Sequence, residues 1–335
     1  MLQEIIPGLV FPNIYCKANY LFFCREYWLK NREVDTFIKR PMQQIIEMDA
    51  ADYSYENLRK ITQNFHVPAV VRGLFKNTTA CREWGTRGGM SKHIGKHTIP
   101  VVVDGKLGSN QREKKSDTFE NAFNDILDNN SSEIYLFFPL LSRDHVSFIG
   151  GSHKQLIEDS QKMVLEDLEI NKIIRKGFGT SKHSNYYGTQ FVVGRGQAKD
   201  NVHKLKTTGT GWHCAIGTNY FVQVVGGKRW YFMDPKYSPY MSPLRGGIIH
   251  MMTGDKEMSK IHANIPLKYV DLEAGDMLLN PAWQWHTIEN KEGISIGTPI
   301  REFTFKQSLW NNLHFTSIVI VNKILLKLGV HIDVY

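Results

Sequence analysis

Two histidines far apart in the sequence have the side-chain type needed to bind a transition metal. His213 is followed by Cys214 and Ala215, and His286 comes 73 residues after His213. Imidazoles brought together on neighbouring strands are ligands for ferrous iron, and a carboxylate normally completes such a set of two histidines and one acid. Residues i and i+2 of a strand share one face, so the acid is expected where Ala215 stands. The missing carboxylate is the main clue to the chemistry.

A short apolar segment after His213 is expected to form part of the site. We predict that Tyr220–Val225 is a buried strand, that Gly226-Gly227 is a tight hairpin turn, and that Lys228–Met233 is the returning strand. Lys228 would then lie on a strand next to the one that carries His213. In that position its ammonium could hold an acidic co-substrate beside the metal.

A second segment is expected to deliver His286. It consists of a short apolar strand, Met277–Leu279, followed by the aromatic turn Pro281–Trp285. Together with Trp212, the two tryptophans of this turn are candidates to line a substrate pocket. Aromatic residues beside a barrel strand are more often core packing, and we keep both interpretations here.

Around these residues the chain resembles the cupin-like Jumonji C superfamily of iron and 2-oxoglutarate oxygenases, particularly the branch of the factor-inhibiting asparaginyl hydroxylase. The resemblance covers roughly residues 40 to 305. It includes the entry segment 64–74, which looks like the family's Pro-Val-Val-Ile-Arg-Gly-Leu strand, the Gly-x-Lys-Arg-Trp turn that ends at Trp230, and the Gly-Asp…Pro-x-x-Trp-x-His pattern that ends at His286. It implies a mainly β fold with flanking helices (α+β), namely a double-stranded β-helix or jelly roll.

The resemblance also implies roles for individual residues. In the family, a threonine three residues before the first histidine and a lysine fifteen residues after it bind the 2-oxoglutarate carboxylate. These positions are Thr210 and Lys228, and an asparagine that is common near that pocket corresponds to Asn219. Arg301, fifteen residues after His286, is a second candidate cation for the co-substrate or a substrate carboxylate, with a surface ion pair as the alternative.

A tyrosine donates a hydrogen bond to the co-substrate in the resembled family. Tyr186 and Tyr187 precede the apolar run Gln190–Val193 and are both candidates for this role. The metal ligands implied by the resemblance are His213 and His286, which would hold iron(II).

The chain departs from the family where His-x-Asp becomes His213-Cys214-Ala215. Loss of the carboxylate removes one negative charge from the iron and leaves room for a halide. The 2-oxoglutarate halogenases, a related group with the same core, have alanine or glycine at this position, and chloride or bromide binds there. We therefore predict an iron(II)- and 2-oxoglutarate-dependent halogenase that uses O2 and acts on an unactivated carbon.

Two alternatives to halogenation remain at this point. One is a 2-oxoglutarate-dependent hydroxylase with a two-histidine iron site, and the other is a catalytically inactive cupin-like binding protein. An inactive relative often loses the second histidine or the co-substrate lysine as well, whereas His286, Lys228 and Thr210 are all present. We expect a small-molecule substrate, with a protein side chain as the alternative.

Composition limits the location and the partners of the protein. The 335 residues are 42% hydrophobic, but they contain no run of 18 apolar residues and no basic start followed by an apolar stretch. We therefore expect no membrane span and a cytoplasmic location. The net charge of +8 is spread along the chain, so no nucleic-acid partner is expected.

Four cysteines without CxxC spacing indicate neither a disulfide framework nor a zinc site. Cys214 has an alternative interpretation as a thiolate ligand. Strand alternation points it away from the face of His213, which favours a packed core residue. A reducing compartment suits both these cysteines and ferrous iron.

The chain divides into three predicted parts. Residues 1–62 are expected to form an N-terminal helical extension, in which Tyr55–Gln63 fits a short amphipathic helix. Residues 63–305 are the Jumonji C or cupin-like catalytic core. Residues 306–335 are expected to form a C-terminal helical segment with an apolar stripe, which either makes a homodimer or packs on its own barrel.

Overall fold

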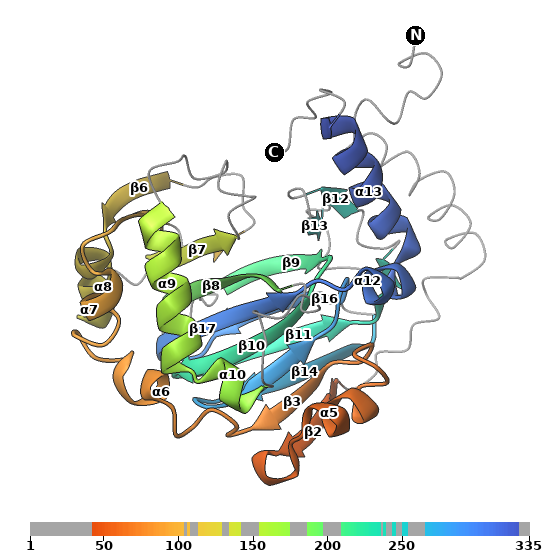
Figure 1. Cartoon of the computed structure of the whole chain (residues 1–335), viewed down its shortest axis with the longest axis horizontal. Helices are drawn as coiled ribbons and strands as arrows, with labels where there is room; N and C mark the ends of the chain where they lie inside the picture. Colours follow the sequence, from red (N-terminus) through yellow and green to blue (C-terminus); the bar gives the residue numbers. More distant parts are fainter. Residues whose placement is uncertain are drawn as a thin grey trace, which may run out of the picture.

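Two β-sheets face each other, and helices cover the outer side of one of them (Figure 1). The computed structural model describes residues 42–103, 106–107, 113–128, 134–141, 154–174, 186–196, 209–235, 237–238, 243–245, 250–253 and 265–327. Long antiparallel pairings between strands distant in sequence build both sheets. This arrangement agrees with the predicted jelly roll with flanking helices.

The eight-stranded sheet carries both histidines. Its order is β1 (Gln43–Gln44), β14 (Leu267–Leu272), β11 (Lys228–Met233), β16 (Trp285–Asn290), β9 (Gly209–Ala215), β13 (His250–Thr253) and β12 (Pro243–Arg245), with β5 (Lys106–Leu107) paired to β9. The strands β16 and β9 are neighbours, so the two histidine-bearing segments are joined by backbone hydrogen bonds although they are far apart in the sequence.

The nine-stranded sheet lies opposite. Its order is β2 (Ile46–Asp49), β3 (Ala69–Arg72), β15 (Met277–Asn280), β10 (Thr218–Val225), β17 (Gly293–Glu302), β8 (Tyr186–Gly196), β7 (Tyr135–Leu141), β4 (Thr98–Val103) and β6 (Glu113–Thr118). The predicted strand at Met277–Leu279 is confirmed as part of β15. Among these strands β10 is almost wholly buried on both faces, because helices cover one side and the other sheet covers the second.

The helices that cover the nine-stranded sheet share one apolar core with it. They are α6 (Thr79–Glu83), α7 (Ser91–Ile94), α8 (Phe119–Leu127), α9 (Lys154–Asp167) and α10 (Ile170–Ile173). Phe191 and Val222 from the sheet pack with Phe123 of α8 and Val164 of α9 in this core. Figure 1 shows α9 running across the strands β8, β17 and β10. Burial of this apolar layer is the main force that fixes the outer side of the sheet.

The remaining helices lie elsewhere on the barrel. They are α5 (Tyr55–Ile61), the 3-10 turn η3 (Ala50–Asp52), α12 (Phe305–Asn311) and α13 (Leu313–Lys327). The helix predicted at Tyr55–Gln63 is confirmed as α5, which begins after Ser54, whose hydroxyl accepts a hydrogen bond from Asn57 N. Helical structure after Phe305 is confirmed as well. Among the described residues no helix is long and apolar enough to cross a membrane.

A second apolar cluster lies between the two sheets. Trp230, Val270 and Ile288 from the eight-stranded sheet pack with Phe221 and Leu278 from the nine-stranded sheet. Residues of β11, β14 and β16 that alternate with these point to the outer face. The cluster therefore identifies which residues of each strand face the interior of the barrel.

The predicted hairpin at Gly226-Gly227 is wrong. The strands β10 and β11 belong to different sheets, and the two glycines form an arch between them. A two-residue type I′ hairpin needs positive φ at both central residues, and of the two glycines only Gly226 has one, at 64°. Lys228 consequently lies on a strand next to β16, which carries His286, and not next to the strand of His213.

The prediction of a helical N-terminal extension is wrong for residues 43–49. The strands β1 and β2 occupy these positions and pair in parallel with β14 and β3. They are short, they lie at the edges of their sheets, and most of their side chains are exposed, so they lack the alternation that signals a strand. Residues 1–41 lie outside the described residues, and the boundaries of the three predicted parts stay a prediction.

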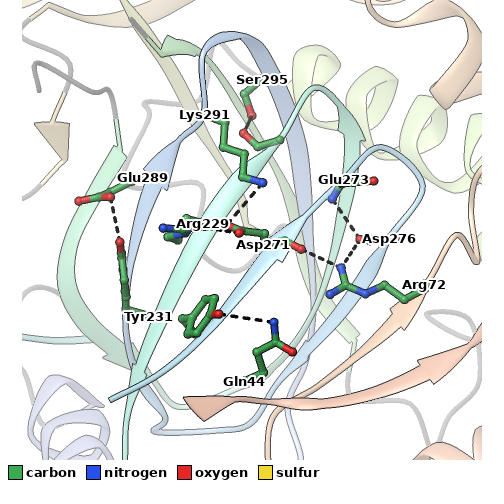
Figure 2. Close-up of polar contacts among 12 residues, drawn as sticks. Gln44, Arg72, Arg229, Tyr231, Asp271, Glu273, Asp276, Glu289, Lys291 and Ser295 are labelled. Carbon is green, nitrogen blue, oxygen red and sulfur yellow. Dashed lines mark hydrogen bonds and ion pairs between the residues drawn. The ribbon is translucent and has the colours of Figure 1, made fainter. Parts of the chain in front are cut away.

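Paired charges occupy the outer face of the eight-stranded sheet (Figure 2). Arg229 donates two hydrogen bonds to the carboxylate of Asp271, at 2.7 and 2.6 Å. Lys291 Nζ lies 3.5 Å from the same carboxylate. At the edge of the barrel, Arg72 contacts both Asp276 and Glu47. These charges have partners of opposite sign, whereas several buried side-chain oxygens of the described interior, such as those of Asn219 and Asn280, have no hydrogen bond.

Candidate functional site

His213 and His286 lie directly opposite each other on β9 and β16. Their ring centroids are 4.1 Å apart. The Nδ1 atom of each ring lies 2.8 Å from a carbonyl oxygen two residues earlier in the chain, that of Gly211 for His213 and that of Gln284 for His286. A carbonyl oxygen can only accept, so each Nδ1–H donates and Nε2 is the lone-pair nitrogen of each ring. This tautomer is the one that binds a metal through Nε2.

The protonation state of His213 also suits a metal ligand. Burial lowers the pKa of His213 to about 4, and the positive charge of Arg301 acts in the same direction, although the hydrogen bond to Gly211 opposes it. The imidazole is therefore neutral at pH 7. Metal binding requires a neutral imidazole, so no proton has to be removed before a metal can bind.

The aromatic turn before β16 fixes the position of His286. Trp283 adopts a left-handed backbone conformation, with φ of 60°, and its amide donates to the carbonyl oxygen of Ala215 at 2.7 Å. The indole of Trp283 donates to Thr316 of α13 at 2.9 Å. Trp230 stacks on the His286 ring, with centroids 5.0 Å apart. The turn thus ties the two histidine strands to each other and to the C-terminal helices.

An irregular pairing lets Thr210 and His213 both face the interior. Thr210 pairs with Ile288, and His213 pairs with His286, so three steps along β9 match two steps along β16. A bulge of this kind inserts one extra residue and turns the following side chains to the other face. The pairing of β9 with β13 is regular from His213 to Ala215, so Ala215 shares the face of His213.

The two histidines are the only candidate metal ligands that the described residues bring together at this site. Among the described residues no group of three or more histidine, cysteine, aspartate or glutamate side chains is placed to hold a metal ion. Cys214, which alternates with His213 along β9, is fully buried, as expected for a core residue. The tryptophans at 283 and 285 are also buried, and both contact Phe315 of α13, which favours core packing over a pocket lining.

Lys228 lies in the interior at the start of β11. Its side chain is fully buried, and its ammonium donates to the side-chain oxygen of Asn290, its partner on β16. Among the described residues it forms no ion pair with a carboxylate. Burial lowers the pKa of Lys228 to about 7, because an amide does not offset the cost of a buried charge. An anion bound beside it would restore its charge.

Tyr135 is a candidate site residue that the sequence did not reveal. It lies on β7, opposite Gly194 of β8 in the strand register. Its neighbour Leu136 packs in the core under the helices, so the side chain of Tyr135 faces the interior of the barrel. Burial raises the pKa of its hydroxyl, and the nearby Thr210 side chain offsets part of that rise without making a hydrogen bond of normal geometry. Tyr135 is thus a candidate hydrogen-bond donor next to the predicted co-substrate residue Thr210.

The two tyrosines predicted for that role fall at the beginning of β8. The backbone of Tyr186 pairs with Glu302, and the side chains of Tyr186 and Tyr187 lie outside what the structure describes. Their role stays a prediction. A signal for Tyr135 exists in retrospect, because it begins the apolar run Tyr135–Leu141 and carries the one hydroxyl in it.

Asn219 and Arg301 lie side by side on the nine-stranded sheet. Asn219 pairs with Arg301 on one side and with Asn280 on the other. Arg301 is only 9% exposed, so the interpretation as a surface ion pair is wrong. The amide of Asn280 lies 3.4 Å from Nδ1 of His286. The structure thus brings the residues predicted from both histidine motifs into one interior, with Lys228 on the eight-stranded sheet and Arg301 on the nine-stranded sheet.

Residues 57–299, most of the chain, match the family described as cupin-like domain. The chain belongs to this cupin-like family. The family is of the Jumonji C type and fits the 2-oxoglutarate oxygenase superfamily, so the predicted fold class is confirmed. A comparison with curated proteins gives no match. The finer resemblance to the asparaginyl hydroxylase branch and to halogenases stays a prediction.

Proposed function

We propose that the protein is an iron(II)- and 2-oxoglutarate-dependent halogenase that acts on an unactivated carbon of a small molecule. The observation that carries this proposal is the position of Ala215. It shares a strand face with His213 on β9, and the neighbouring strand β16 carries His286. An oxygenase of this superfamily would have its carboxylate at the position of Ala215. A methyl group there leaves room for chloride or bromide beside a metal.

The described residues fit both groups that this activity needs. Two imidazoles with Nδ1–H bonded to carbonyl oxygens suit iron(II), which binds nitrogen ligands. A buried lysine whose only described partner is an amide suits a carboxylate. Asn290, the partner of Lys228, and His286 are four residues apart on β16, about 13 Å of strand. An extended lysine side chain and a short dicarboxylate fill that length together.

Each residue then has a defined task. His213 and His286 would hold the iron, and Lys228 with Thr210 would hold the far carboxylate of 2-oxoglutarate, with Asn219 near that pocket. Bound there, these groups would supply the oxidation: with O2, a halide and one proton, a C–H bond would become a carbon–halogen bond, and 2-oxoglutarate would become succinate and CO2 with release of water. The closely packed aromatic residues around His286 limit access of water to this side of the site.

Lys228 also has to change its proton content. With a pKa of about 7 in the ligand-free protein, a large fraction of its amine is neutral at neutral pH. A carboxylate placed beside it favours the charged form, so co-substrate binding is expected to take up a proton. Calorimetry in buffers of different ionisation enthalpy measures this uptake directly.

The halide position can be tested without the substrate. Crystals grown without oxygen in the presence of iron(II), 2-oxoglutarate and bromide should show anomalous bromide density beside Ala215. Ala215→Asp should remove that density by filling the position, whereas Ala215→Gly, the matched control, should keep it. Water in place of bromide in the wild-type protein would contradict the proposal.

The product distinguishes halogenation from hydroxylation. With the true substrate, 2-oxoglutarate consumption should depend on chloride or bromide, and the product mass should contain the halogen. A product heavier by one oxygen, formed at the same rate without halide, would make the protein a two-histidine hydroxylase. Binding of substrate with no turnover at all would instead identify an inactive cupin-like binding protein.

We also propose that the C-terminal helices form a homodimer. Large apolar side chains are exposed on α12 and α13, including Trp310 at 78% and Leu313. Such residues on neighbouring helices are typical of an interaction surface. Sedimentation should therefore give a dimer for the wild-type protein and a monomer for Trp310→Glu.

A further inference from the structure

We infer that His66, Ser308 and Asn311 are positioning residues that fix the backbone of Ala215 beside the two histidines. We call these three residues the helix clamp, because two of them lie on α12. The inference rests on the proposed function and deepens it, because it names the side chains that set the halide position. It depends on hydrogen bonds that reach two backbone segments of the site from α12.

One face of α12 contacts both histidine-bearing segments. Ser308 Oγ donates to the carbonyl oxygen of Ile216 at 2.7 Å, directly after β9 ends at Ala215. Asn311 Nδ2 donates to the carbonyl oxygen of Ala282 at 2.9 Å, in the turn before β16. Residues three apart in a helix lie on the same face, so α12 joins the two segments from one side.

The two segments are also bonded directly to each other. The amide of Trp283 donates to the carbonyl oxygen of Ala215 at 2.7 Å, and Trp283 follows Ala282 in the chain. The pairing of β9 with β16 ends at His213 and His286, so Ala215 lies two residues beyond it. The distance of Ala215 from the strand of His286 therefore depends on the bond to Trp283, and a shift of the turn at Ala282 would move the donor.

His66 fixes the amide of Asn311. The carbonyl oxygen of Ala282 can only accept, so Asn311 turns Nδ2 toward it, and Oδ1 is hydrogen-bonded to Nδ1 of His66. An amide oxygen can only accept as well, so Nδ1–H of His66 is the donor. Both ends of the Asn311 amide are thus used, one by the turn and one by His66. Rotation of the amide would break both bonds.

The backbone before His66 adopts a strained conformation. Gln63, Asn64 and Phe65 all have positive φ, at 52°, 60° and 64°. Asparagine tolerates this region, whereas side chains such as those of Gln63 and Phe65 rarely adopt it. The left-handed turn lets Phe65 pack in the core while His66, the next residue, contacts α12. Such strain persists only where the surroundings require it, so it is a second, independent indication that the contact of His66 has a role.

The backbone of Ala215 matters because its side chain is only a methyl group. The room that it leaves beside a bound metal is therefore set by the path of β9. Small displacements of residues at a site change binding strongly, and supporting contacts are what prevent them. Side chains that touch neither the metal nor the halide would thus decide how well the halide fits.

The variants keep or remove single hydrogen bonds of the helix clamp. His66→Asn places an amide N–H where Nδ1 of the imidazole lies, whereas His66→Gln places it where Nε2 lies. Only His66→Asn should therefore preserve the bond to Asn311. Asn311→Asp keeps an acceptor for His66 and loses the donor to Ala282. Asn64→Gly, which removes an exposed side chain from the same left-handed turn, is the matched control.

The experiment uses the full chain with cobalt(II) and saturating 2-oxoglutarate in the absence of oxygen. The visible absorption of cobalt reports its coordination, and titration with bromide gives the halide affinity. We expect His66→Ala, His66→Gln and Asn311→Asp to change the spectrum and to weaken bromide at least fivefold, while each still binds one cobalt per chain. His66→Asn and Asn64→Gly should keep the wild-type spectrum and a bromide affinity within twofold of wild type.

A second readout needs no metal. With isotopically labelled histidine, the imidazole NMR signals of His213 and His286 can be assigned from the single variants. In the metal-free protein these signals should shift in His66→Ala and keep their positions in His66→Asn. Thermal melting of each variant separates the alternatives, because a purely structural role would lower the melting temperature and leave the two signals unchanged.

Two results would overturn the inference. They are unchanged histidine signals in His66→Ala, and equal effects of His66→Asn and His66→Ala. Failure of the proposed function has a different signature. If the wild-type protein binds no cobalt, or if bromide does not change the cobalt spectrum, the halogenase proposal fails. The histidine signals of the metal-free protein still decide whether the helix clamp positions the two histidines.

Discussion

Lys228 and Arg229 are neighbours on β11, yet they meet opposite conditions. Arg229 lies on the outer face, where Asp271 accepts two hydrogen bonds from it (Figure 2). The ring of Tyr269 lies 5.5 Å from the guanidinium carbon of Arg229. Lys228 lies in the interior with the amide of Asn290. The carboxylate raises the pKa of Arg229, and burial lowers that of Lys228. Because side chains alternate along a strand, Arg229 reaches a carboxylate on the outer face, whereas the adjacent Lys228 is buried next to a neutral amide.

The same difference extends to the two regions as a whole. On the outside, Asp276 accepts hydrogen bonds from the amides of Gly73 and Glu273 and from Arg72, so its carboxylate is fully used by the fold. In the interior, the oxygens of Asn219 and Asn280 remain without partners. The outer polar groups therefore hold the barrel together, whereas the interior groups are the ones that the proposed ligands would contact. Mutations in the two regions should separate binding from stability.

The largest expected effect concerns the metal. His213→Ala or His286→Ala should abolish iron binding, because two protein ligands leave none to spare. His97→Ala removes an imidazole that contacts Asp159 away from the site and serves as the control. Iron content per chain, measured by elemental analysis after loading and desalting, shows whether each variant still binds iron. Normal stoichiometry in both single variants would contradict the assignment of the site.

The second effect is expected at Lys228. Removing one partner of a buried charge pair costs roughly 3–5 kcal/mol, so Lys228→Met should weaken 2-oxoglutarate binding by at least a hundredfold. Lys291→Met removes a nearby lysine that is partly exposed and pairs with Asp271, and it should leave the affinity unchanged. Calorimetry measures both variants. An unchanged affinity in Lys228→Met would place the co-substrate carboxylate elsewhere.

Lys228→Met should weaken co-substrate binding but increase the free energy of unfolding of the ligand-free protein. The pKa of Lys228 falls from 10.5 to about 7 on folding, so the unfolded chain binds more protons between these values. The cost of the buried lysine is therefore full below pH 7, on the order of 5 kcal/mol, and disappears as pH rises toward 10.5. Lys228→Met should be more stable than wild type to urea at pH 7, and this advantage should shrink at pH 9.5. A constant difference would show that protonation is not its cause.

The sequence predicts the fold class and the strands that carry the candidate site better than it predicts how those strands are connected, and the chemistry of the site stays a prediction. The family pattern groups Thr210 and Lys228 with His213, and all three face the interior, but for Thr210 this depends on the bulge in β9 and not on strand alternation. The hairpin prediction failed because a strand buried on both faces, such as β10, carries no mark of the sheet to which its successor belongs. Tyr135 escaped notice because its neighbour Thr210 is far away in the sequence.

A third effect, on stability alone, is expected at Asp276. Its side chain is 6% exposed, and Asp276→Ala would remove the acceptor of two backbone amides and one of the acceptors of Arg72. Loss of one partner from such a buried set costs about 3 kcal/mol. Glu47→Ala removes the other, more exposed partner of Arg72 and should cost less than about 1 kcal/mol. Urea unfolding at pH 7 measures both, and 2-oxoglutarate affinity should be unchanged in each.

The smallest effect is expected for the outer pair itself. The side chains of Arg229 and Asp271 are 40% and 30% exposed, so solvent and salt screen their attraction. A double-mutant cycle of Arg229→Gln and Asp271→Asn should give a coupling of about 1 kcal/mol or less, which decreases at high salt. Because Arg229 lowers the pKa of Asp271 below 3.8, this contribution should be present above pH 3.8 and lost as pH falls through the lower, folded value. A coupling of several kcal/mol, as large as the expected effect of Lys228→Met, would contradict this prediction. So would a coupling that salt leaves unchanged, because solvent and ions would then not screen the outer face.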